Sequence, residues 1–257
     1  SKERVELVEW SPIRRHVVCV ETRERRPYLW QWRRPKWVES GPMEKGISDA
    51  AGALRRRNPR DGRLTFRFFL GPDGDVWVAL HLSGWLGAAP LAGGNPIVAQ
   101  LGDVHPRSRL AAITSDRERS LVAVLTVRTS PNPVEDTSEA RSWRIGTEEL
   151  QVTEIPCANV DLQRTHLLLG GADSVCSVSP VRLVSLGSRG WTVSPHPTDP
   201  AAFLRFGLDR DGRLLSSTGS FVYRLDGATW TKLGETVPHL LWLAGAGDGS
   251  IVAPTWE

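Results

Sequence analysis

Residues 203–233, FLRFGLDRDGRLLSSTGSFVYRLDGATWTKL, decide the fold. Residues 203–209 have the apolar character of a strand, and Arg210-Asp211-Gly212 has the chemistry of a turn. Two more short strands follow, and Asp226-Gly227 leads into a fourth. Asp-Gly pairs favour tight turns between antiparallel strands. This stretch therefore predicts a unit of four short antiparallel strands.

The unit repeats along the chain, and its closing hairpin is the best marker. An apolar residue ends one strand, a polar turn follows, and a large apolar residue five positions later opens the next strand. Four pairs show this offset: Trp32 and Trp37, Ile145 and Leu150, Leu186 and Trp191, Leu225 and Trp230. The last three anchors are 41 and 39 residues apart. This period falls near the roughly 40–50 residues of a four-stranded propeller blade.

We therefore predict an all-β protein, a β-propeller of five or six four-stranded antiparallel blades. Strands from both chain ends could close the ring. A single domain over residues 1–257 is expected, with approximate units at 5–39, 64–104, 109–155, 165–194, 203–233 and a half unit at 240–257. In the second unit, either 85–91 or 97–101 could supply the outer strand.

Two stretches interrupt the strand pattern. Residues 43–57 contain Ser48-Asp49 before an alanine-rich segment, which could cap a short helix. Residues 128–141 are polar and contain two prolines, which predicts a mobile loop between strands.

The Asp-Gly turns and Trp anchors resemble those of bacterial β-propeller repeats of the two-component-regulator and lyase-like kind. The resemblance covers most of the chain but rests on turns and spacing only. No unit carries the Gly-His and Trp-Asp signature of WD40 repeats. It implies a fold and transfers no activity.

Composition limits the classes of protein to which the chain could belong. Its 257 residues are 40% apolar and 24% charged, as in a folded globular protein. No apolar run approaches the roughly 20 residues of a membrane helix. The first 16 residues lack the apolar region of a signal peptide. Only three cysteines occur, widely spaced, so we expect a cytoplasmic protein without disulfides.

The charge is uneven along the chain. Residues 1–67 hold 17 basic and 9 acidic side chains, whereas the remainder holds 15 basic and 20 acidic ones. Arginines near predicted turns are the candidate binding residues: Arg25, Arg26, Arg33, Arg34, Arg55, Arg56, Arg57 and Arg60. Such a cluster could dock a protein with an acidic surface. A solvated surface balanced by neighbouring glutamates explains it equally well. Nucleic acid is disfavoured, because the rest of the chain is acidic.

No residue pattern requires a metal, a cofactor or a catalytic centre. Asp73-Gly74-Asp75 and Asp209-Arg210-Asp211-Gly212 resemble calcium loops, but Gly207 stands where such a loop needs another acidic residue. Asp-Gly turns explain both segments. The six histidines show no metal-ligand spacing, and the repeated tryptophans are expected to pack between blades.

Our principal functional hypothesis is a non-enzymatic propeller that docks a partner protein or domain in a larger assembly. The first alternative is a lectin-like glycan-binding propeller, which would expose one Trp per blade. The second alternative is a propeller-type lyase or hydrolase, which would gather acid and base groups at the centre of the ring.

Overall fold

The structure is a computed structural model of the whole chain. It describes residues 4–11, 13–33, 36–58, 64–102, 104, 108–115, 121–128, 138–145, 151–154, 166–169, 175–179, 182–187, 190–195, 205–211, 213–217, 221–226, 229–235, 243–245 and 251–252. For the strands between residues 138 and 195 it describes the backbone only. No helix in the described part of the chain is long and apolar enough to cross a membrane.

In four of the five sheets, antiparallel strands follow one another in sequence order, and the last sheet adds one parallel pair. The first sheet contains β1 (Arg4–Ser11), β2 (His16–Arg23), β3 (Arg26–Arg33) and β4 (Lys36–Pro42). The second contains β5 (Thr65–Leu70), β6 (Val76–Leu82), β7 (Trp85–Pro90) and β8 (Ile97–Gln100). Both segments that competed for the outer strand of the second unit are therefore strands.

Three more sheets follow, of which the last departs from this order. The third contains β9 (Arg109–Ser115), β10 (Leu121–Arg128), β11 (Ser138–Ile145) and β12 (Gln151–Glu154). The fourth contains β13 (His166–Leu169), β14 (Val175–Ser179), β15 (Arg182–Gly187) and β16 (Gly190–Pro195). The last contains β17 (Arg205–Leu208), β18 (Leu214–Ser217), β19 (Phe221–Asp226), β20 (Thr229–Glu235), β21 (Leu243–Gly245) and β22 (Ile251–Val252). The loop expected at 128–141 is shorter than predicted, because β11 begins at Ser138; residues 129–137 lie outside the described residues.

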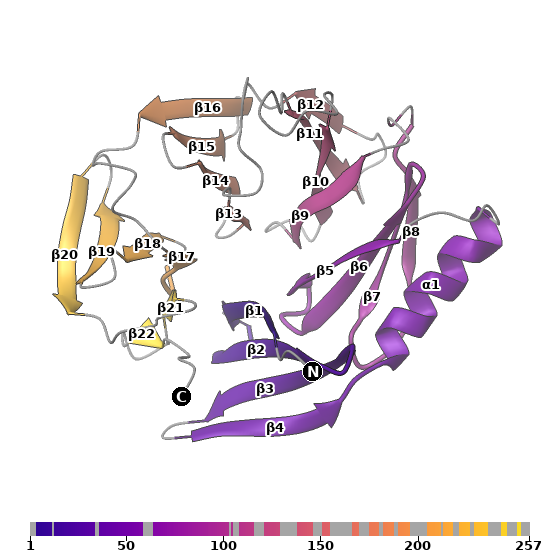
Figure 1. Cartoon of the computed structure of the whole chain (residues 1–257), viewed down its shortest axis with the longest axis horizontal. Coiled ribbons are helices and arrows are strands. Elements are labelled where there is room, and N and C mark those ends of the chain that lie inside the picture. Colours follow the sequence, from indigo (N-terminus) through magenta and orange to yellow (C-terminus); the bar gives the residue numbers. More distant parts are fainter. Residues whose placement is uncertain are drawn as a thin grey trace.

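The sheets stand around a common centre, as the blades of a propeller do (Figure 1). The first strands β1, β5, β9, β13 and β17 lie nearest the centre, and β4, β8, β12, β16 and β20 lie outermost. Strand β21 pairs in parallel with β17 and also contacts β1. The two chain ends therefore meet where the ring closes, which agrees with the predicted architecture.

The hairpin marker read from the sequence corresponds to direct pairing between strands. Leu225 lies opposite Trp230, and Leu186 lies opposite Trp191. In the first sheet, Trp32 and Trp37 are paired in the same way, with ring centroids 5.4 Å apart. The five-residue offset therefore identifies the hairpin between the two outer strands of a blade.

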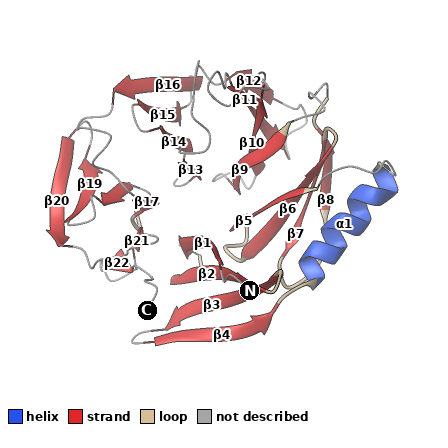
Figure 2. Cartoon of the chain, in the orientation of Figure 1, coloured by secondary structure: helices blue, strands red, loops and turns tan. Residues whose placement is uncertain are grey.

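The one helix in the described part of the chain, α1 (Lys45–Arg57), packs against the second sheet, mainly on its middle strands β6 and β7 (Figure 2). It begins before the predicted cap at Ser48-Asp49, and no side chain caps it. Asp49 instead pairs with Lys45 at 2.8 Å and accepts the N–H of Gly94 at 3.0 Å. The helix lies close to β7, since a Cβ on Gly87 would lie 2.7 Å from Leu54 Cγ. The predicted capping role is therefore wrong, although the predicted helix exists.

The core lies between neighbouring sheets rather than inside one of them. Leu7 and Val20 of the first sheet pack with Phe68 and Val78 of the second. The other face of the second sheet packs against the third through a larger cluster: Phe69, Trp77, Leu86, Leu110, Leu121 and Leu125. Apolar side chains on both faces of a strand are required in such a stack of sheets. This arrangement places the edges of the innermost strands at the centre of the ring.

Candidate functional site

The structure separates the predicted arginine cluster into several places. Arg25 and Arg26 lie at the turn between β2 and β3, whereas Arg33 lies at the opposite end of β3. Seven residues of strand place Arg26 and Arg33 roughly 23 Å apart. Arg34 and Arg60 lie outside the described residues. The described members of the cluster do not form one patch on the first sheet.

The helix carries the remaining members of the cluster. Arg55, Arg56 and Arg57 form its last turn and are exposed. Arg26 pairs with Glu44 at 3.1 Å, at the other end of α1. A helix of 13 residues is about 20 Å long, so Arg26 lies far from the last turn. A role for any of these arginines in binding stays a prediction.

One neighbour of the cluster, Arg23, is held by the first sheet itself. Its guanidinium contacts Glu21 at 2.8 Å and Glu39 at 3.3 Å. It also lies over the rings of Tyr28 and Trp30, 4.9 and 5.1 Å from their centroids. These contacts satisfy the guanidinium within its own blade, which fits the alternative of a balanced surface at this position.

A carboxyl group without a cationic partner among the described residues lies on the innermost strand of the first blade. Glu9 of β1 is partly buried, and the backbone N–H of Leu70 in β5 donates a hydrogen bond to it. Burial raises the pKa of Glu9 from 4.5 to about 8, and the hydrogen bond only partly opposes this rise. No ion pair of Glu9 is present among the described residues, whereas most described carboxylates have an arginine or lysine partner.

The fold explains why a polar side chain is needed at this position. Leu70 is the last residue of an innermost strand, which has a sheet neighbour on one edge only. Glu9 accepts the Leu70 N–H from one side, and the Ser115 hydroxyl of β9 donates to the Leu70 carbonyl at 3.0 Å. Buried backbone groups require such partners. The inner strands β1 and β9, on either side of β5, thus bring Glu9 and Ser115 to the same residue, Leu70.

The opposite end of β5 offers a different surface. Phe66 is 41% exposed, and Arg67 beside it is exposed as well. The Leu110 N–H donates to Thr65 Oγ1 at 3.3 Å, which brings the start of β9, with the exposed Arg109, next to the start of β5. Phe66, Arg67 and Arg109 are therefore all exposed at this end, with Phe66 and Arg67 on opposite faces of β5. Four residues of strand separate Phe66 from Leu70, about 13 Å.

The two Asp-Gly segments are turns, as the sequence indicated. Asp73 Oδ1 accepts the N–H of Asp75 at 3.1 Å and the indole N–H of Trp77 at 2.9 Å. Asp209 Oδ1 accepts the backbone N–H groups of Asp211 and Arg213, both at 2.8 Å. These carboxylates already stabilise the turns between the first and second strands of their blades.

His81 is the histidine whose surroundings the structure describes most fully. It is 3% exposed in β6, and Gly84 donates its backbone N–H to Nε2 at 3.4 Å. Burial lowers the pKa of His81 to about 4, so the ring is neutral at pH 7. This histidine supports the turn after β6 and lies away from Glu9.

The tryptophans whose side chains the structure describes are buried or half-buried. Trp77 is buried between the second and third sheets, and Trp30, Trp32 and Trp37 pack against the apolar residues of the first. Trp230 on the outer strand β20 is half-buried. Packing between and within blades is thus their role, and the lectin-like alternative finds no exposed Trp among them.

Sequence reasoning missed Glu9, although a signal for it was available. The first unit was predicted to begin at residue 5, and Glu9 is a carboxyl close to that start. A charge among the apolar residues Val5, Leu7 and Val8 could have been noticed. Only the closed ring, however, places β5 against this side chain and removes its water.

Comparison with known proteins supports the fold. No protein-family model matches the chain, and no curated protein matches it. Solved structures do. A gluconolactonase from Xanthomonas campestris aligns over 98% of this chain and 82% of its own, with 11% identity and a TM-score of 0.58. A catalytically inactive variant of virginiamycin B lyase from Staphylococcus aureus, with quinupristin, aligns over 94% and 74%, with 16% identity and a TM-score of 0.52.

A third structure belongs to the other kind of propeller that the repeats resemble. It is the extracellular domain of a protein from B. thetaiotaomicron assigned to the hybrid two-component systems. It aligns over 93% of this chain and 30% of its own, with 10% identity and a TM-score of 0.50. Together the three likenesses confirm the predicted β-propeller fold, and at these identities they show the fold alone.

Proposed function

We propose that the protein is a propeller-type lyase or hydrolase that cleaves an ester or lactone of a small organic molecule at the centre of the ring, with Glu9 as the proton-transferring group. The observation that carries this proposal is the position of Glu9, a carboxyl on the innermost strand β1 that faces β5 and has no cationic partner in the described part of the chain. Two of the solved structures described above are a lyase and a gluconolactonase, which favours this alternative over a docking module.

The protonation state of Glu9 suits proton transfer near neutral pH. A general acid or base is most effective when its pKa lies near the working pH, and burial brings the pKa of Glu9 to about 8. In hydrolysis, water would add to the carbonyl carbon, the acid form of Glu9 would protonate the alcohol oxygen as the acyl C–O bond breaks, and the proton released by the added water would return to the Glu9 carboxylate. In elimination, the carboxylate would remove a proton from carbon, a C=C bond would form, and the C–O bond would break with its electron pair on the leaving carboxylate.

The other groups of the site have positioning roles in this proposal. The Leu70 N–H orients the Glu9 carboxyl, and Ser115 fixes the Leu70 peptide from the next blade. Phe66 and Arg109 at the far end of β5 offer an apolar contact and a positive charge to a substrate. Such a combination fits an organic molecule with an acidic or strongly polar group.

Turnover of two probe compounds tests the proposal. D-Glucono-δ-lactone and quinupristin are incubated with the protein over a range of pH, and the products are separated by mass spectrometry. Hydrolysis yields a product heavier by one water, whereas elimination leaves the mass unchanged. We expect kcat/KM for the active probe to change through an ionisation near pH 8. If kcat/KM falls as the pH rises through this ionisation, Glu9 acts as the acid. If kcat/KM rises with the pH, Glu9 acts as the base.

Glu9→Gln is the decisive variant, since the amide keeps an acceptor for the Leu70 N–H but carries no proton to transfer. We expect kcat to fall by about 100-fold or more and the ionisation near pH 8 to vanish. Glu24→Gln, in the exposed turn after β2, is the matched control and should leave kcat unchanged. The proposal fails if neither probe is turned over, or if Glu9→Gln retains the parent rate.

A further inference from the structure

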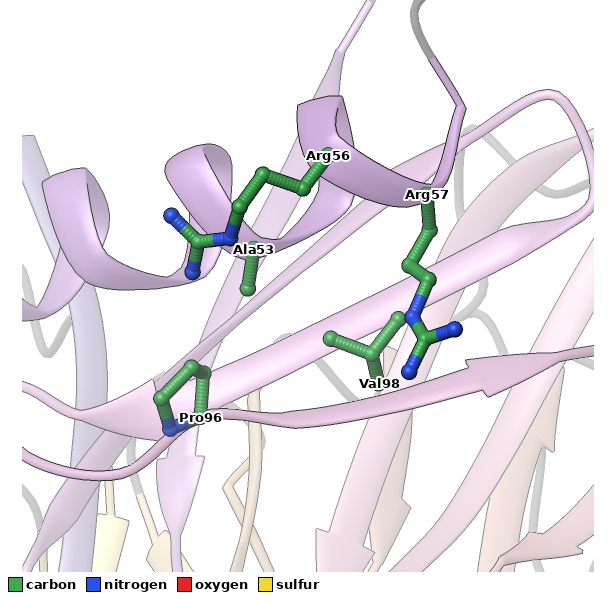
Figure 3. A pocket seen from close by; sticks show the side chains of 5 residues that line it. All are labelled: Ala53, Arg56, Arg57, Pro96 and Val98. Carbon is green, nitrogen blue, oxygen red and sulfur yellow. The ribbon is translucent and has the colours of Figure 1, made fainter.

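A second candidate site lies on the outside of the ring, where the last turn of α1 passes over β8 (Figure 3). Here the surface encloses a hollow of about 290 Å³, lined by Ala53, Arg56, Arg57, Pro96 and Val98. This volume is at the lower limit of small-molecule sites, which commonly enclose about 300–1,000 Å³. The hollow lies on the outer side of the second sheet, whose inner strands lie between it and the propeller axis, so this site is separate from Glu9.

The two arginines of the hollow have no competing partner among the residues that the structure describes. Neither Arg56 nor Arg57 forms a hydrogen bond or ion pair with another described residue, and both are exposed. Figure 3 shows that they project from the last turn of α1 on two sides of the hollow. Arg56 lies back along the helix, where a Cβ on Gly52 would be 3.6 Å from its Nη1. Two guanidinium groups without a partner in the described part of the chain therefore border one small volume.

The floor of the hollow is apolar. Ala53 and Val98 are side chains of modest size, and Pro96 adds its ring at the start of β8. The helix is held at a fixed height above the sheet, because Leu54 and Ala50 pack directly onto Gly87. The apolar floor can contact the apolar body of a ligand while the two guanidinium groups above it bind an acidic group of the same ligand.

A helix end alone explains only part of this arrangement. Cations in the last turn of a helix interact favourably with its dipole, and this accounts for basic residues at all three positions, Arg55 to Arg57. It does not account for the hollow, which two of the three arginines line and Arg55 does not. Arg55 therefore serves as an internal control for the general charge of the helix end.

We propose that this hollow binds a small organic anion, whose carboxylate or phosphate is held by Arg56 and Arg57 while its apolar body contacts Ala53, Pro96 and Val98. Guanidinium groups bind both acidic groups through paired hydrogen bonds, so the arginines alone do not select between them. The apolar floor selects organic anions over inorganic ones. The site goes beyond the proposed catalytic function and neither requires it nor contributes to it.

Isothermal titration calorimetry with four probes tests the proposal: benzoate, phenyl phosphate, inorganic phosphate and benzyl alcohol. We expect one or both organic anions to bind with a Kd of about 1 mM or tighter. Inorganic phosphate and benzyl alcohol should bind at least about tenfold more weakly. Inorganic phosphate lacks the apolar body, and benzyl alcohol lacks the acidic group. The tighter of the two organic anions identifies the preferred acidic group.

Two variants connect the binding to the hollow. Arg56→Gln/Arg57→Gln should weaken organic-anion binding by at least about tenfold, and Arg55→Gln should leave it unchanged. Both variants replace exposed side chains, and equal melting temperatures verify that the fold is intact. The proposal is overturned if neither organic anion binds, if inorganic phosphate or benzyl alcohol binds as well, if the double variant binds like the parent, or if Arg55→Gln weakens binding equally. Activity on an ester plays no part in these readouts, so each proposal can fail alone.

Discussion

Glu9→Gln is expected to stabilise the folded protein at neutral and alkaline pH, and the gain should grow as the pH rises. The folded state holds the pKa of Glu9 at about 8, against 4.5 for an ordinary carboxyl. Between these values the folded chain keeps a proton that the unfolded chain has released. The free energy of unfolding of the parent therefore falls as the pH rises from about 4.5 to about 8, while the amide variant lacks this loss.

The size of the effect follows from the pKa difference. Each unit corresponds to about 1.36 kcal/mol, so the Glu9 carboxyl would lower the free energy of unfolding by about 3 kcal/mol at pH 7 and by at most about 5 kcal/mol above pH 8. Below about pH 4.5 the carboxyl is protonated in both states, and the parent and the variant should then differ only through packing. The expected signature is a difference that grows with pH.

Urea unfolding at several pH values from about 5 to about 9, followed by tryptophan fluorescence, measures this difference. Glu24→Gln, with its exposed side chain, is the control, and its difference from the parent should vary little with pH. A constant difference between Glu9→Gln and the parent over the whole range would refute the reasoning, because it would mean that the strands around Glu9 do not exclude water from its carboxyl.

Three further predictions follow from single residues. His81 has its pKa lowered to about 4 by burial, so the parent should lose stability as the pH falls from about 6.5 to 4, by up to about 3 kcal/mol; the acid limb of a pH–stability curve should flatten in His81→Asn. Gly87→Ala should lower the melting temperature, since its Cβ would lie 2.7 Å from Leu54 Cγ and overpacking costs about 1–3 kcal/mol, whereas Gly234→Ala, whose Cβ meets open space, should not. Cys19 is buried, and burial together with Glu21 raises its pKa to about 12; a thiol reagent should label it only on unfolding, and rapid native labelling would contradict its placement.

The blade repeat could be predicted from the sequence because its signal is local. The pairs Leu225–Trp230 and Leu186–Trp191 are five residues apart, and a tight turn brings such neighbours into register without help from the rest of the chain. The start of α1 is not determined by a local sequence signal. Its first turn is fixed by tertiary contacts, such as the hydrogen bond from the Gly46 N–H to the Leu91 carbonyl at 3.0 Å, so a search for capping side chains placed it too late.

The candidate sites were harder to predict because they join residues distant in sequence. Arg26 and Arg33 are seven positions apart and appear clustered, yet a strand carries them to opposite ends of a blade. Arg57 and Val98 are 41 positions apart and line one hollow. The environment of Glu9 depends on Leu70 from the second blade. Residues that are close in sequence therefore appear clustered although a strand separates them. Residues that are far apart in sequence form a site only once the blades and the helix have packed.

The way this chain treats its other carboxylates strengthens the interpretation of Glu9. Arginine is abundant, and Asp75, Asp209 and Asp226 each lie within 3 Å of an arginine nitrogen. Such pairing keeps a carboxylate charged in the folded state. Glu9 instead lies in a desolvated position, where the Leu70 backbone N–H is its partner among the described residues, and its ionisation opposes folding. A glutamine could accept the same hydrogen bond without that cost. A carboxyl retained where an amide would be more stable is the pattern expected of a group whose proton is used.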